Sequence, residues 1–143
     1  MLECTMRNFF ITLALLFLQI GSVVAGPIEW TAVHKTRVGR NAEVTGYAAE
    51  ETIVKKGNLA KMWHLWDYKK PQGNPKEPVM SAANKSEFDC IKRNARVLMV
   101  VFYDGGMGSG AEDADDEEDP RAWLPADHDE MHSKLLNLAC GKN

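Results

Sequence analysis

Residues 59–68 read LAKMWHLWDY, and this segment decides the fold. Side chains alternate between the two faces of a β-strand, so Met62, His64 and Trp66 point one way while Trp63 and Leu65 point the other. Large apolar side chains therefore occur on both faces. Such a segment is typical of a central strand that is covered on both sides.

Further segments favour strands around this one. After the first 25 residues, 96–103 (RVLMVVFY) is the most β-prone run, and it is apolar on both faces, as in an interior strand. Residues 28–33, 44–56 and 79–90 contain shorter strand-like runs. Residues 69–78 contain three prolines and a Gly-Asn pair, so the sequence predicts a loop there.

The end of the chain has a helical periodicity instead. We expect Asp127 to cap a helix that begins near His128, and Gly141 to end it. Its apolar stripe consists of Met131, Leu135, Leu136, Leu138 and Ala139. The sequence therefore predicts an α+β fold, an antiparallel sheet of about five to six strands with one amphipathic C-terminal helix.

The first 25 of the 143 residues have the pattern of a signal peptide. Arg7 supplies positive charge, residues 9–20 form a nearly unbroken apolar run, and Ala25 ends a stretch of small residues that signal peptidase can recognise. This run is shorter than the ~20 residues of a membrane span. We expect 1–25 to be removed, leaving a single domain over 26–143 with no membrane span, exported to the periplasm, the cell surface or the medium. A retained N-terminal anchor is the alternative.

Two cysteines remain after residues 1–25, because Cys4 leaves with the leader. An even pair in an exported protein favours one disulfide, here between Cys90 and Cys140. This bond would tie the terminal helix to the sheet beside Phe88. Two unpaired buried thiols are the alternative. The spacing fits neither a zinc motif nor a redox CxxC motif.

The composition argues against several classes of function. With 17 basic and 20 acidic residues, the net charge of -3 gives no general attraction to nucleic acid. The serines and the four histidines show no spacing that marks a nucleophile and its base. Acidic residues, rather than a Lys-Ser/Thr pair, follow the glycines of 104–110, which excludes a phosphate loop. We expect no enzymatic activity and no cofactor.

Residues 112–119 (EDADDEED) hold seven carboxylates in eight positions. We expect an acidic loop inserted into the domain. Hard oxygen ligands on a loop can bind Ca²⁺, and the candidate ligands are Asp113, Asp115, Glu117 and Asp119. A solvated, self-repelling loop without a cation is the alternative.

Two other patterns leave alternatives open. His128 and His132 lie one helical turn apart and could chelate a transition metal, although the sequence shows no third ligand; two solvated helix positions are the other interpretation. The aromatic residues could line a ligand groove or belong to the core, and they are Trp30, Trp63, Trp66, Tyr68 and Trp123.

The predicted loop of residues 69–78 is the first candidate for a partner-binding surface, because it is basic and exposed. Lys69, Lys70 and Gln72 are the residues that we expect to contact the partner. Other basic residues could extend this surface into a basic face, namely Lys55, Lys56, Lys92, Arg93 and Arg96.

Four segments occur in an order and spacing that mark a family. They are KMWHLWDYKKPQ (61–72), SEFDCIKRNARVL (86–98), VVFYDGGMGSG (100–110) and LACGK (138–142). Together they resemble the surface-adhesin protein E family of exported bacterial proteins, over most of the chain from Trp30 to Cys140.

The resemblance implies an antiparallel sheet with a C-terminal helix, tied by a disulfide at Cys90 and Cys140. It also implies an exported, non-enzymatic binding protein whose partner is a protein, such as a host matrix or serum protein. A periplasmic accessory or structural protein, with weak divalent-cation binding through the acidic loop, is the alternative. The chain departs from the family pattern in the acidic insertion and at 125–127, where Pro-Ala-Asp replaces the commoner Pro-Gly-Ser.

Overall fold

The structure is a computed structural model that describes residues 27–39, 42–116 and 121–141. The expected signal peptide, 1–25, lies outside the described residues. The elements are β1 (Thr31–Val38), β2 (Ala42–Lys56), β3 (Leu59–Asn74), β4 (Glu77–Asp89), β5 (Asn94–Tyr103), the single-turn 3₁₀ helix η1 (Gly106–Gly108), β6 (Glu112–Asp116), β7 (Leu124–Pro125) and α1 (Glu130–Cys140).

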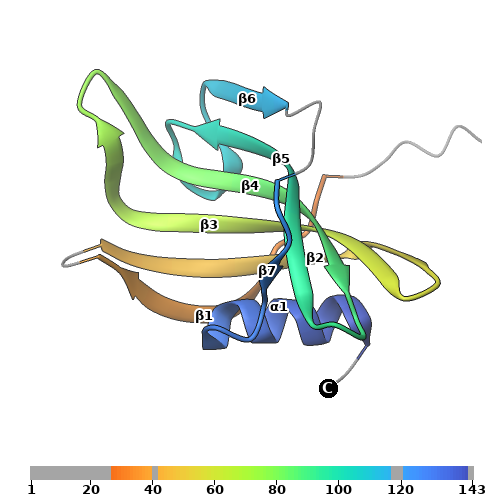
Figure 1. The fold of residues 1–143 in the computed structure, drawn as a ribbon. Helices are drawn as coiled ribbons and strands as arrows, with labels where there is room; N and C mark the ends of the chain where they lie inside the picture. The colour runs from red at the N-terminus through yellow and green to blue at the C-terminus, as the bar shows by residue number, and fades with distance from the viewer. Residues whose placement is uncertain (1–26, 40–41, 117–120, 142–143) are drawn as a thin grey trace, which may run out of the picture.

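The strands form one antiparallel sheet, and the helix packs against one of its faces (Figure 1). The strand order is β1-β2-β3-β4-β5-β6, and the two-residue strand β7 also pairs with β5, beside β6. Strands that follow one another in sequence are neighbours in space, since short turns can join antiparallel strands. The predicted α+β fold with one C-terminal helix is confirmed.

Strand β3 is a central strand, as its aromatic alternation predicts. It pairs with β2 and β4 along most of its length, so that Trp66 lies opposite Gly46 on one side and Ala82 on the other. Met62 and His64 are buried on the face toward α1. Its two neighbours satisfy the backbone hydrogen bonds along both edges of β3. The helix covers one end of its inner face.

The predicted loop at 69–78 is wrong. Strand β3 continues to Asn74 and β4 begins at Glu77, with Gln72 opposite Val79 and Gly73 opposite Pro78. Prolines are tolerated here because Pro71 lies where the pairing register shifts, between Asp67 and Gln72. The segment is therefore the distal part of the β3–β4 hairpin.

The predicted acidic loop is also wrong for its first five residues. Glu112–Asp116 form strand β6, which pairs with β5 from Met99 to Tyr103. The free edge of β5 offers backbone hydrogen bonds that outweigh the poor strand propensity of aspartate. Charged side chains are common on edge strands, because they oppose pairing with further chains. Residues 117–119 lie outside the described part.

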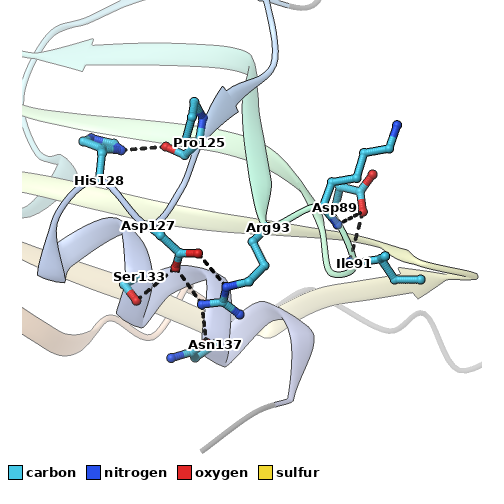
Figure 2. Close-up of polar contacts among 9 residues, drawn as sticks. Asp89, Ile91, Arg93, Pro125, Asp127, His128, Ser133 and Asn137 are labelled. Carbon is cyan, nitrogen blue, oxygen red and sulfur yellow. Dashed lines mark hydrogen bonds and ion pairs between the residues drawn. The ribbon is translucent and has the colours of Figure 1, made fainter.

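Helix α1 begins two residues later than the sequence predicts. Asp129, not Asp127, is the N-cap, because its Oδ1 accepts the backbone N–H of His132 at 2.8 Å. The carboxylate of Asp127 instead accepts two hydrogen bonds from the guanidinium of Arg93, at 2.6 and 2.7 Å (Figure 2). Gly141 ends the helix in the left-handed conformation, as expected.

The core lies between α1 and the sheet. The helix buries Met131, Leu135, Leu136 and Ala139, whereas Leu138 is only partly buried. These side chains pack on the sheet residues Ala48, Ala60, Met62 and Phe88. Gly46 lies directly under the thioether of Met131, where the space of a larger residue is already occupied. The absence of a side chain at Gly46 therefore lets the helix approach the sheet.

A disulfide joins Cys90, just after β4, to Cys140, the last residue of α1. The predicted pairing is confirmed, and the helix is tied to the sheet at its C-terminal end. Among the described residues, no helix has both the length and the apolar character needed to cross a membrane.

Candidate functional site

Helix α1 covers only part of the inner face of the sheet. Its 11 residues give a length of about 16 Å, whereas the 16 residues of β3 extend over about 50 Å. The helix lies over the end of the face that carries Met62 and Phe88. Beyond its N-terminus the face continues with Trp66 and Tyr68, which are only half-buried. An open surface results.

This surface is hollowed into two adjoining cavities, which we call the sheet–helix groove. The inner cavity has a volume of about 260 Å³ and reaches His64 and Leu135 beside β7. The outer one has a volume of about 580 Å³ and extends from Arg37 on β1 to Phe102 on β5. Both cavities are lined by Trp66, Asn84, Arg121 and His132.

A buried histidine forms the floor of the inner cavity. His64 is 5 % exposed, and its Nε2 lies 2.9 Å from the hydroxyl of Ser86. Burial, reinforced by the nearby charge of His132, lowers the pKa of His64 to about 3. The imidazole is therefore neutral at physiological pH, and the hydroxyl of Ser86 satisfies one ring nitrogen of His64.

At the start of α1 a carboxylate lies between two imidazoles. Asp129 Oδ2 is 2.9 Å from His128 Nε2 and 2.8 Å from His132 Nδ1. Partial burial alone would raise the pKa of Asp129, but hydrogen bonds from the backbone and imidazole of His132 hold it below its usual value. Asp129 is thus ionised near neutral pH. His132 also packs against Trp66, with ring centroids 5.3 Å apart.

Ion pairs fix the segment that borders the inner cavity. Arg96 donates to the buried carboxylate of Glu87 at 2.6 Å and lies 4.6 Å above the ring of Trp123. At the other end of this segment, Asp127 holds Arg93, whose Nη2 also donates to Asn137 on α1 (Figure 2). Residues 123–127 are therefore held to both the sheet and the helix.

The chemistry of the groove suits binding. Trp66, Tyr68 and Phe102 offer aromatic surface for apolar contact, while Arg37 and Arg121 place cationic groups at its rim. Burial raises the pKa of Tyr68, so its hydroxyl keeps its proton and can donate a hydrogen bond.

The family comparison assigns the chain. Residues 30–141 match the family described as "Surface-adhesin protein E". This match covers most of the chain. The chain belongs to the surface-adhesin protein E family. The order of motifs from 61–72 to 138–142 thus identifies the family correctly.

Solved structures of Haemophilus influenzae protein E share the fold of this adhesin-family chain. One crystal form has a TM-score of 0.56 at 18 % identity and covers 82 % of this chain and 94 % of its own. Protein E from non-typeable Haemophilus influenzae has a TM-score of 0.53 at 16 % identity, with 81 % of each chain covered. No curated protein matches the sequence. At this identity the similarity shows a common fold.

The partner-contact residues predicted from the sequence lie on the distal β3–β4 hairpin of this adhesin-family chain, outside the sheet–helix groove. Lys69 and Lys70 are exposed. The ammonium of Lys69 is 3.7 Å from Glu43, which also pairs with Lys35 at 2.7 Å. The amide of Gln72 folds back and donates to the carbonyl oxygen of Lys70 at 2.8 Å. The two lysines, rather than the glutamine, are therefore presented outward.

The predicted cation ligands are only partly described in this adhesin-family chain. Asp113 and Asp115 lie on one face of β6, and Asp115 pairs with Arg121 at 3.4 Å. Glu117 and Asp119 lie outside the described residues. Calcium binding by this acidic segment stays a prediction.

The structure also shows where the aromatic, basic and histidine candidates lie. Of the aromatic residues considered for a groove, Trp66 and Tyr68 line it, whereas Trp30, Trp63 and Trp123 do not. Two of the residues considered for a basic face, Arg93 and Arg96, form ion pairs with Asp127 and Glu87 in this adhesin-family chain. For the histidine pair, the structure adds Asp129 as the third potential metal ligand.

Several groove residues of this adhesin-family chain were not singled out from the sequence, among them Arg121 and Asn84. Arg121 follows the acidic run and shows no pattern of its own. Asn84 belongs to a polar strand, and only the strand register shows that it lies opposite His64. The alternation of β3 could have pointed to this face, because it places His64, Trp66 and Tyr68 together.

Proposed function

We propose that this chain is an exported, non-enzymatic adhesin that binds a host matrix or serum protein. Membership in a family described as surface adhesins is the single observation that carries the proposal. The disulfide supports export, since such bonds persist in oxidising compartments. The leader-like pattern of residues 1–25 supports it as well.

The distal β3–β4 hairpin is the surface that we propose for this partner. In Figure 1 the hairpin curls away from the rest of the sheet, and residues 73–77 at its tip are exposed. The pairing of β4 with β5 begins only at Ser81, which leaves the distal strands beyond the support of β5. Lys69, Lys70 and Lys76 give it three exposed cationic side chains. These fit an acidic patch on a protein partner.

The first prediction is that the K69E/K70E double variant captures less partner. Reversal of two exposed charges should weaken binding to immobilised vitronectin or laminin by roughly tenfold, because like charges would then face the acidic patch. Surface plasmon resonance at low and physiological salt measures this, and the wild-type protein should lose affinity as salt rises.

The matched control is K56E/K92E, which changes the net charge by the same amount at exposed positions outside the hairpin. It should bind like the wild-type protein. Equal loss in both double variants would show that net charge alone acts. Unchanged binding by K69E/K70E would rule out the hairpin as the contact surface.

Surface residence is a separate part of the proposal. Antibodies against the purified protein should label intact cells if the adhesin is displayed outside. Labelling only after the outer envelope is permeabilised would support the periplasmic accessory role instead.

A further inference from the structure

Three metal-ligating side chains converge where the sheet–helix groove meets α1. Among the described residues, His128, Asp129 and His132 each offer a ligand atom, and these atoms lie within 4.8 Å of one another. The rings of His128 and His132 lie side by side, with centroids 4.3 Å apart and planes tilted by 37°. All three side chains remain accessible to solvent, with His132 half-buried against Trp66. A small ion can therefore reach them.

The hydrogen bond from His128 to the backbone determines which of its ring nitrogens can bind an ion. Its Nδ1 lies 2.7 Å from the carbonyl oxygen of Pro125 (Figure 2). A carbonyl oxygen can only accept, so Nδ1 carries the hydrogen and donates it. In the neutral ring, the lone pair is then on Nε2. Metal-binding histidines usually have this arrangement, in which one nitrogen donates to a carbonyl and the other faces the ion.

Nε2 of His128 faces another acceptor. Asp129 Oδ2, the oxygen of a carboxylate group, is 2.9 Å away. Two lone pairs at this distance repel unless a proton or a metal ion lies between them. His132 Nδ1 approaches the same Oδ2 at 2.8 Å. Two imidazole nitrogens thus approach the same carboxylate oxygen, and three potential metal-ligand atoms lie close together.

We propose that His128, Asp129 and His132 bind a divalent transition-metal ion of the zinc class. Two imidazole nitrogens and one carboxylate oxygen are the ligand set that such ions prefer over calcium or magnesium. Tetrahedral zinc places its ligand atoms roughly 3.3 Å apart, so small side-chain rotations expand the present 2.8–2.9 Å spacing. The remaining coordination position is open to water or to a group of a partner.

The fold holds the three ligands in place. Met131 and Leu135 anchor the first turns of α1 in the core. Asp129 Oδ1 accepts the backbone N–H of His132, which orients the carboxylate and leaves Oδ2 directed at the rings. On the sheet side, the ring of His132 packs against Trp66, with ring centroids 5.3 Å apart. Metal binding therefore requires little reorganisation of the protein.

The test is titration of the disulfide-bonded, untagged protein with zinc chloride after treatment with a chelator. Isothermal calorimetry should show one zinc ion per chain. Titration with cobalt chloride should give visible absorption of the intensity typical of a tetrahedral site with nitrogen and oxygen ligands. The same zinc titration in excess calcium chloride should give an unchanged isotherm, because these ligands prefer zinc over calcium.

Variants separate this site from adventitious binding. H128A and H132A should each lower zinc affinity at least about tenfold, because each removes a ligand. D129N should do the same while the helix stays folded, since asparagine caps a helix as well as aspartate. His34 lies outside the cluster, so H34A is the matched histidine control and should bind zinc like the wild-type protein. Circular dichroism of each variant checks that α1 is intact.

Absence of heat and of a cobalt spectrum up to millimolar metal would overturn the proposal. So would zinc binding that H128A, D129N and H132A leave unchanged, or that H34A weakens equally. Comparison of partner capture with zinc and with chelator keeps the two proposals apart. Calorimetry tests the metal site independently of whether a matrix protein binds.

Discussion

Reduction of the Cys90–Cys140 disulfide is expected to lower the free energy of unfolding by about 4 kcal/mol. The bond closes a loop with a sequence separation of 50 residues, and its loss returns that conformational freedom to the unfolded chain. A domain of this size is stabilised by roughly 5–15 kcal/mol in total. The reduced protein should therefore be only marginally folded at physiological temperature.

Urea denaturation with and without reductant measures this difference. The C90A/C140A double variant is the matched control, because it lacks the bond and should unfold at the same urea concentration under both conditions. If reductant leaves the wild-type midpoint unchanged, the disulfide contributes nothing to stability. We expect α1 to lose protection from hydrogen exchange first, since the bond holds its last residue.

Acidification is expected to destabilise the protein through His64. Above pH 6.5 the residue is neutral in both states and contributes no pH dependence. Below pH 6.5 the unfolded chain binds a proton that the folded protein excludes until its own pKa of about 3. Stability should thus fall by up to about 1.4 kcal/mol per pH unit as pH decreases through this window.

Chemical denaturation at a series of pH values between 7 and about 4 measures this slope. The H64Q variant should lose most of it, because glutamine can still bond to Ser86 but does not titrate. The S86A variant is the control: it removes the hydrogen bond but leaves a buried imidazole, so the slope should persist. An equal slope in H64Q and the wild-type protein would contradict the assignment to His64.

The elements that the sequence predicts correctly are those whose own residues carry the signal. The alternation in 59–68 identifies a central strand, and the stripe from Met131 to Ala139 identifies the helix that packs on it. The order of motifs identifies the family. For the strand and the helix, residues close together in the sequence show the periodicity of the buried side chains.

The errors occur where residues respond to distant partners. Glu112–Asp116 become a strand because β5 has an edge to pair with, although aspartate alone favours a loop. Asp127 is not the helix cap because Arg93, 34 residues away, takes its carboxylate. The three prolines do not interrupt the hairpin, because Pro71 lies at a register shift, Pro75 lies in the turn and Pro78 is the second residue of β4.

The sequence by itself determined the central strands, the helix, the pairing of the two cysteines and the family. Only the tertiary structure decided the sheet–helix groove and the addition of Asp129 to the pair of His128 and His132. The groove exists because an 11-residue helix is too short to cover a 16-residue strand. The cluster depends on a hydrogen bond to the carbonyl of Pro125 and on the rotation of α1. Local sequence patterns encode neither of these.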